Sequence, residues 1–79
     1  MRVMERELSE ILGYYLDREY DLDALQGALA ELTWSNLEAP RAAHRIEFLI
    51  GEAIDGRLGL DDLRTELEQV RRSLLLALA

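Results

Sequence analysis

The chain has 79 residues, no cysteine and a formal net charge of -7, and these properties exclude several kinds of protein. We expect one domain over residues 1–79, without disulfide bonds or a thiolate metal site. The negative charge repels phosphates, so we expect no nucleic acid partner. Residues 1–7 lack the apolar core of a signal peptide, and no apolar run is long enough to span a bilayer. We therefore expect a cytoplasmic protein with no membrane partner.

The first half of the chain has the pattern of two helices. Seventeen leucines and nine alanines favour helix, whereas one proline and few β-branched residues disfavour sheet. The first helix is predicted over residues 3–19 by apolar residues at helical spacing. These residues are Met4, Leu8, Ile11, Leu12, Tyr15 and Leu16. Segment 17–21 interrupts the pattern, and a second apolar stripe, ending near Trp34, predicts the second helix.

Two aspartates compete for the N-cap of this second helix. Asp23 has Gln26 three residues later, as a capping box requires, whereas Asp21 would leave Tyr20 and Leu25 as a hydrophobic staple. The sequence does not choose between them.

The second half repeats this arrangement after a link over residues 35–40. Pro40 suits the first turn of a third helix, where a missing N–H has no cost. That helix carries an apolar stripe that ends at Ile54, and glycines follow where a helix should stop. The fourth helix has an apolar seam made of Leu60, Leu63, Leu67, Val70 and Leu74.

Residues 8–32 align with residues 46–70 at a constant offset of 38. Six positions are identical: Gly13/Gly51, Asp17/Asp55, Leu22/Leu60, Asp23/Asp61, Leu25/Leu63 and Leu29/Leu67. We therefore predict an all-α fold: a compact four-helix bundle built from two repeated αα-hairpins, about 3–34 and about 41–77, with pseudo-twofold symmetry. An alternative is an intertwined dimer in which both hairpins pack against a second chain.

Glycine inside a helix costs about 1 kcal/mol relative to alanine, so the paired Gly13 and Gly51 call for a reason. We expect close backbone approach where the first and third helices cross. Shared descent of the two halves, with no present role for the glycines, is the alternative.

The sequence offers little for catalysis or metal binding, and we predict no enzymatic activity, no catalytic residue, no cofactor and no metal site. Asp17, Glu19, Asp21 and Asp23 alternate as calcium ligands do, but Leu22 and Ala28 stand where an EF-hand loop needs glycine and glutamate. We interpret these carboxylates as capping and turn residues. His44 is the only histidine and has no predicted catalytic or metal-ligating companions.

The acidic first half suggests a basic protein partner. Residues 1–38 carry nine acidic residues and three arginines, whereas residues 39–79 carry seven and six. Aromatic residues beside acidic ones are typical interface anchors. Tyr20 and Trp34 are further aromatic candidates for a partner contact, but they lie at helix ends, where such residues commonly cap a small core. The predicted contact residues are Glu7, Glu10, Tyr14 and Asp17 on the first helix, Phe48 on the third, and Leu75 and Leu76 on the last.

Two hypotheses of function follow. The first is a small acidic interaction module, most concretely an immunity protein or antitoxin that neutralises a basic partner. The alternative is a structural homo-oligomerisation or adaptor module, with a homodimer formed through the C-terminal helix.

Overall fold

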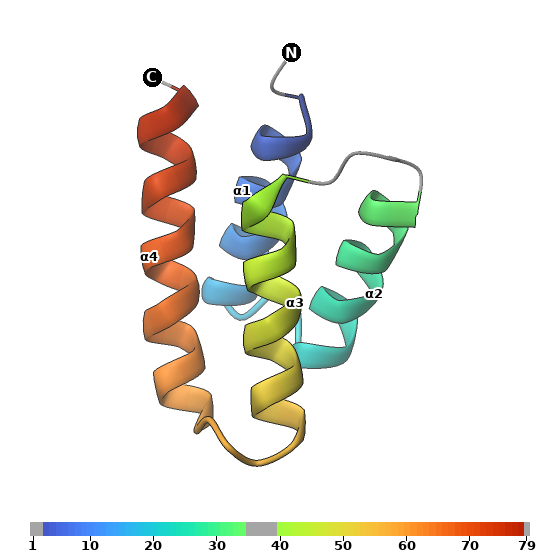
Figure 1. Ribbon diagram of the computed structural model, residues 1–79, viewed down its shortest axis with the longest axis vertical. Coiled ribbons are helices and arrows are strands. Elements are labelled where there is room, and N and C mark those ends of the chain that lie inside the picture. Colours follow the sequence, from blue (N-terminus) through green and yellow to red (C-terminus); the bar gives the residue numbers. More distant parts are fainter. Residues whose placement is uncertain (1–2, 35–39, 79) are drawn as a thin grey trace.

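The computed structural model describes residues 3–34 and 40–78, which form four helices. They are α1 (Val3–Leu16), α2 (Leu22–Trp34), α3 (Arg41–Ile54) and α4 (Leu60–Leu78). The described part of the chain contains no strand, and the fold is an all-helical bundle as predicted (Figure 1). The predicted link over 35–39 lies outside the described residues.

Each helix packs against its neighbours in the order α1, α2, α3, α4 and back to α1. The contact between α1 and α4 is the most extensive, and that between α2 and α3 is the least. Both hairpin turns lie at the same end of the molecule (Figure 1). The Cα radius of gyration is 11.7 Å, and about 11.6 Å is expected for a compact chain of this length. The two hairpins therefore cover each other within one chain, and the intertwined dimer is not needed to bury the apolar stripes.

All four helices contribute to one core. The buried apolar residues are Met4, Leu8, Leu12, Tyr15, Leu25, Leu29, Ala43, Ile46, Leu49, Ile50, Leu63, Leu67 and Leu74. Four pairs at the offset of 38 are buried in both halves, namely 8/46, 12/50, 25/63 and 29/67. The predicted seam of α4 is wrong at its start, because Leu60 is 59% exposed in the first turn of that helix.

The first helix ends three residues earlier than predicted because Arg18 adopts a left-handed conformation, with φ of 66°. The amide of Arg18 donates to Tyr15 O, and that of Glu19 donates to Tyr14 O at 2.8 Å. This double hydrogen bond is the Schellman motif that commonly closes a helix. Gly56, with φ of 78°, has the corresponding place after α3.

The structure selects Asp21 as the N-cap of α2. Its Oδ1 accepts a hydrogen bond from the amide of Ala24 at 2.8 Å, and α2 begins at the next residue. Asp23 therefore lies inside the first turn, where its charge favours the positive end of the helix dipole. Pro40 is the N-cap residue of α3 and not part of its first turn.

The expectation for the paired glycines is wrong. A side chain at Gly13 would meet the guanidinium of Arg71 on α4, at 3.1 Å, whereas nothing lies within 4 Å of the equivalent position at Gly51. The extensive contacts of α1 are with α4 and α2, and none of comparable extent joins α1 to α3. Gly13 therefore makes room for an arginine side chain and not for a helix backbone.

Candidate functional site

A groove runs along the surface between α1 and α2. Its volume is about 440 Å³, and it is lined by Glu7, Glu10, Ile11, Tyr14, Tyr20, Ala28, Glu31 and Leu32. Ile11, Ala28 and Leu32 are half-buried and form the apolar floor, whereas Glu7, Glu10 and Glu31 are exposed at the sides. Among the described residues that line this groove, three are acidic and none is basic.

The turn between α1 and α2 builds the aromatic end of the groove. Because the amides of both Glu19 and Tyr20 donate to Tyr14 O, the chain folds back and brings Tyr20 beside Tyr14. The two ring centroids are 5.2 Å apart and the rings are inclined by 43°. Tyr20 also packs against the core, as its predicted place at a helix end requires, whereas Tyr14 is 44% exposed.

On its other side, α1 is held by two arginines of α4. Arg64 donates to the main-chain oxygens of Tyr15 and Leu16, at the C-terminal end of α1, and lies over the Tyr15 ring at 5.6 Å from its centroid. Arg71 donates from Nε to Ser9 O at 3.3 Å. These contacts fix the face of α1 that points away from α4, and with it the stripe of residues that lines the groove.

The predicted contact residues fall into three groups. Glu7, Glu10 and Tyr14 line the α1–α2 groove together. Asp17 does not line it, but shares with Glu10 and Tyr14 a smaller hollow toward α4 that also includes Arg71. These four residues therefore form one continuous surface along α1, with Tyr14 between the two hollows.

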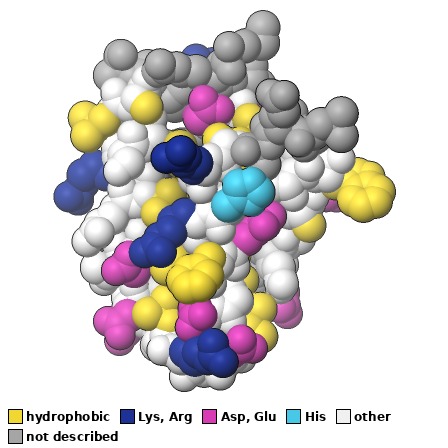
Figure 2. All heavy atoms as spheres, in the orientation of Figure 1, with side chains coloured by type: hydrophobic (Ala, Val, Ile, Leu, Met, Phe, Trp, Pro, Cys, Tyr) yellow, Lys and Arg dark blue, Asp and Glu magenta, His cyan; other side chains and the backbone are white. Residues whose placement is uncertain are grey.

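The other predicted contact residues lie apart from this surface. Phe48 is 56% exposed on α3, where the guanidinium carbon of Arg45 lies 5.8 Å from its ring centroid. Leu75 and Leu76 are 46% and 73% exposed on α4. The face shown in Figure 2 mixes cationic, acidic and apolar side chains over α3 and α4, so it lacks the uniform charge of the groove.

The sequence pattern missed several residues of the groove. Ile11 was predicted only as a core residue, Tyr20 was left open between a partner contact and a cap of the core, and Ala28, Glu31 and Leu32 were given no binding role. The position of Tyr20 could have been predicted from the second half of the sequence. Gly56 there marks a turn that positions Leu58, which aligns with Tyr20 at the offset of 38. Of the two roles left open for Trp34, a cap of the core is wrong, since its side chain is 91% exposed.

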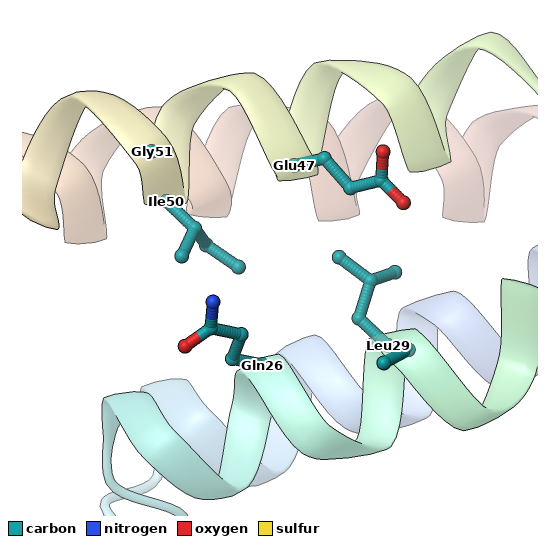
Figure 3. A pocket seen from close by; sticks show the side chains of 6 residues that line it. Gln26, Leu29, Glu47, Ile50 and Gly51 are labelled. Atoms are coloured by element: carbon teal, nitrogen blue, oxygen red, sulfur yellow. The ribbon is translucent and has the colours of Figure 1, made fainter.

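A further hollow lies between α2 and α3, the two neighbouring helices with the least extensive contact. It is lined by Gln26, Leu29, Ala30, Glu47, Ile50 and Gly51. Figure 3 shows Gln26 extending from α2 toward Ile50, and Leu29 facing Glu47. Another hollow, between α3 and α4, is lined by the apolar Ala42, Val70, Leu74 and Ala77 together with Arg41, Arg45 and Ser73.

Over residues 3–34 and 40–78, no three His, Cys, Asp or Glu side chains come together in a way that could hold a metal ion. His44 is exposed on α3. None of the four helices, over their described lengths, has the length and apolar character needed to cross a membrane. The chain matches no protein-family model, no curated protein and no solved structure.

Proposed function

We propose that this chain is a non-enzymatic protein-binding module that uses the α1–α2 groove to bind a basic partner. The observation that carries the proposal is the lining of the groove, in which three carboxylates and two tyrosines surround an apolar floor without a cation. Carboxylates at the rim speed association with a basic surface, and the aromatic residues supply contact area that can be buried.

The most concrete form of this proposal is an immunity protein or antitoxin that neutralises a basic toxin in the cytoplasm. Support comes from the concentration of negative charge in residues 1–38, where the sequence has nine acidic residues and three arginines. The proposed protein has no nucleic acid or membrane partner, no cofactor and no catalytic activity.

The pseudo-twofold repeat belongs to the same proposal, as the scaffold for the groove. Its support is the turn chemistry: the hydrogen bonds Arg18 N to Tyr15 O and Glu19 N to Tyr14 O recur at an offset of 38. The copies differ at the surface, where Tyr14 corresponds to Glu52 and Glu10 to Phe48. We infer that the repeat makes the bundle and that the differences between its copies make the binding surface.

Affinity capture from host cytosol at low salt tests the binding function. The wild-type chain is expected to retain a basic protein that Glu10→Lys loses, because the substitution reverses a charge at the rim of the groove. Glu68→Lys is the matched control, since it makes the same charge change at an exposed position on α4. Equal retention by the wild-type chain and both variants, or no stable complex, contradicts the proposal.

A homodimer through α4 is the second candidate. It is favoured by the exposed Leu75 and Leu76 and by the apolar hollow lined by Ala42, Val70, Leu74 and Ala77. Sedimentation at micromolar concentration is expected to detect a dimer that Leu76→Glu dissociates. A strict monomer at these concentrations rules out this candidate and leaves the first unaffected.

A further inference from the structure

The α1–α2 groove is a trough between two antiparallel helices (Figure 1). On α1 the lining residues 7, 10, 11 and 14 follow helical spacing, and on α2 residues 28, 31 and 32 do the same. Each set is therefore one stripe along its helix. From Glu7 to Tyr14 the trough follows seven residues of α1, which is about 10 Å at 1.5 Å per residue. The Tyr14 and Tyr20 rings close it at the end nearest the hairpin turn.

The walls of the trough favour a helical occupant over an extended one. An extended segment needs partners for its main-chain N–H and C=O groups, as an open sheet edge supplies. Here both walls are α-helices, whose main-chain groups are hydrogen-bonded within the helix along their lengths. A helix satisfies its own main chain and needs only side-chain contacts. Two neighbouring helices with an apolar groove between them are completed by a third packed at about 8 to 10 Å.

The charges of the trough specify the flanks of such a helix. Glu7 and Glu10 are exposed on the α1 side, Glu31 is exposed on the α2 side, and no arginine is among the residues that line the trough. A helix with basic residues on both sides of an apolar stripe would bring its cations to both rims. Arginine would also suit the aromatic end, since in this chain guanidinium groups already lie over the rings of Phe48 and Tyr15.

We infer that the occupant of the α1–α2 groove is a basic amphipathic helix of the partner, packed with its apolar stripe on Ile11, Ala28 and Leu32. This inference rests on the proposed function and adds the secondary structure and side-chain pattern of the segment that binds. Its apolar residues recur at steps of three and four, and lysine or arginine flanks them on both sides.

Peptide titration against the intact chain tests this inference. The probe is a lysine- and arginine-rich peptide with leucine at helical spacing. Its length of about 18 residues exceeds the roughly 12 to 15 below which an isolated helix is marginal. The control peptide has the same composition with leucine at every second position, so that no helical apolar stripe forms. The helical peptide is expected to bind, more weakly at high salt, and to shift the backbone NMR signals of Ile11 and Ala28.

Variants locate the contact. Glu10→Lys and Tyr14→Ala are each expected to weaken binding about tenfold, and Glu68→Lys is expected to leave it unchanged. Circular dichroism establishes that each variant is folded before binding is measured. Equal binding of the two peptides, no binding of either, or shifts confined to α3 and α4 overturns the inference. If the natural partner still depends on Glu10 in the capture experiment, the proposed function survives that result, and a partner indifferent to Glu10 removes both.

Discussion

Arg18 carries backbone strain that its counterpart in the second hairpin avoids. It adopts φ of 66° at the end of α1, where Gly56 adopts 78° at the end of α3. A left-handed conformation costs a residue with a Cβ about 1 to 2 kcal/mol, whereas glycine adopts it freely. Arg18 is exposed, and no described contact requires its side chain. The two halves of the chain thus form the same turn with different residues at the left-handed position.

Replacing Arg18 by glycine is therefore expected to raise the free energy of unfolding by about 0.5 to 1 kcal/mol, because the turn loses its strain. Arg18→Ala is the reference, since it removes the same charge and keeps the Cβ. Gly56→Ala is expected to lower stability by about 1 kcal/mol for the reverse reason. Urea unfolding followed by circular dichroism measures all three, and equal stabilities of Arg18→Gly and Arg18→Ala would contradict the argument.

The two helical glycines make a second matched pair. Gly51 has open space around it, so Gly51→Ala is expected to gain about 1 kcal/mol from helix propensity alone. Gly13→Ala is expected to gain less or to lose stability, because its new methyl group must displace the Arg71 guanidinium that donates to Ser9 O. Thermal unfolding of the two variants checks the order, and a Gly13→Ala variant that is the more stable of the two disproves it.

At the scale of the helices, α4 packs more closely on α1 than α2 packs on α3. Arg64 caps the end of α1 from α4, but its counterpart at the offset of 38 is Gln26, which lines the hollow between α2 and α3. The ring under Arg64 belongs to Tyr15, and the corresponding residue of α3 is Ala53. A shorter polar side chain and the absence of the ring explain why α2 packs less closely on α3 than α4 does on α1.

This difference leads to a prediction about the repeat. Arg64→Gln is expected to lower the free energy of unfolding by about 1 to 2 kcal/mol, because two charge-assisted hydrogen bonds to main-chain oxygens are lost. Gln26→Arg is expected to raise it, by less than 1 kcal/mol, if the proposed pseudo-twofold symmetry brings position 26 near Ala53 O and Ile54 O. Chemical denaturation measures both. A Gln26→Arg variant no more stable than wild type, with Arg64→Gln destabilised, would argue against the symmetry.

The helices were predictable from the sequence, but which residues and helices pack against each of them was not. Apolar spacing predicted α2 and α3, and the bounds of α3 were marked by Pro40 before it and Gly56 after it. The start of α2 depended on an N-cap that the sequence left open between Asp21 and Asp23. The end of α1 was missed because arginine is not a residue that a turn pattern expects in the left-handed region. The role of Gly13 was missed because periodicity identifies the apolar face of a helix without identifying the helix that covers it.

The candidate site was predicted in part for the same reason. Glu7, Glu10 and Tyr14 lie one turn apart on α1, so helical spacing alone brought them together. Ala28, Glu31 and Leu32 line the groove because α2 packs against α1. The sequence pattern does not specify how these two helices pack. Tyr20 joined them through hydrogen bonds to Tyr14 O, a contact set by the turn.

At the scale of the whole molecule, the acidic surface should cost stability. The chain has a net charge of -7, and the ion pairs Arg45 with Glu66 and Arg57 with Glu52 are both partly exposed. Like charges repel across about 30 Å at 10 mM salt, and added salt shortens this distance to about 10 Å at 100 mM. We expect the melting temperature to rise between 10 mM and about 300 mM sodium chloride.

The Glu10→Lys variant tests whether the carboxylates of the groove bind a partner or only keep the protein in solution. It brings the net charge from -7 to about -5 and removes one of the carboxylates that repel their neighbours along the groove. We therefore expect this variant to melt at a higher temperature than wild type at low salt, and to gain less from added salt. If the groove binds a basic partner, the same variant must lose binding while it gains stability. A variant that gains stability and keeps its partner would mean that the carboxylates only keep the protein in solution, and that the binding surface lies elsewhere on the bundle.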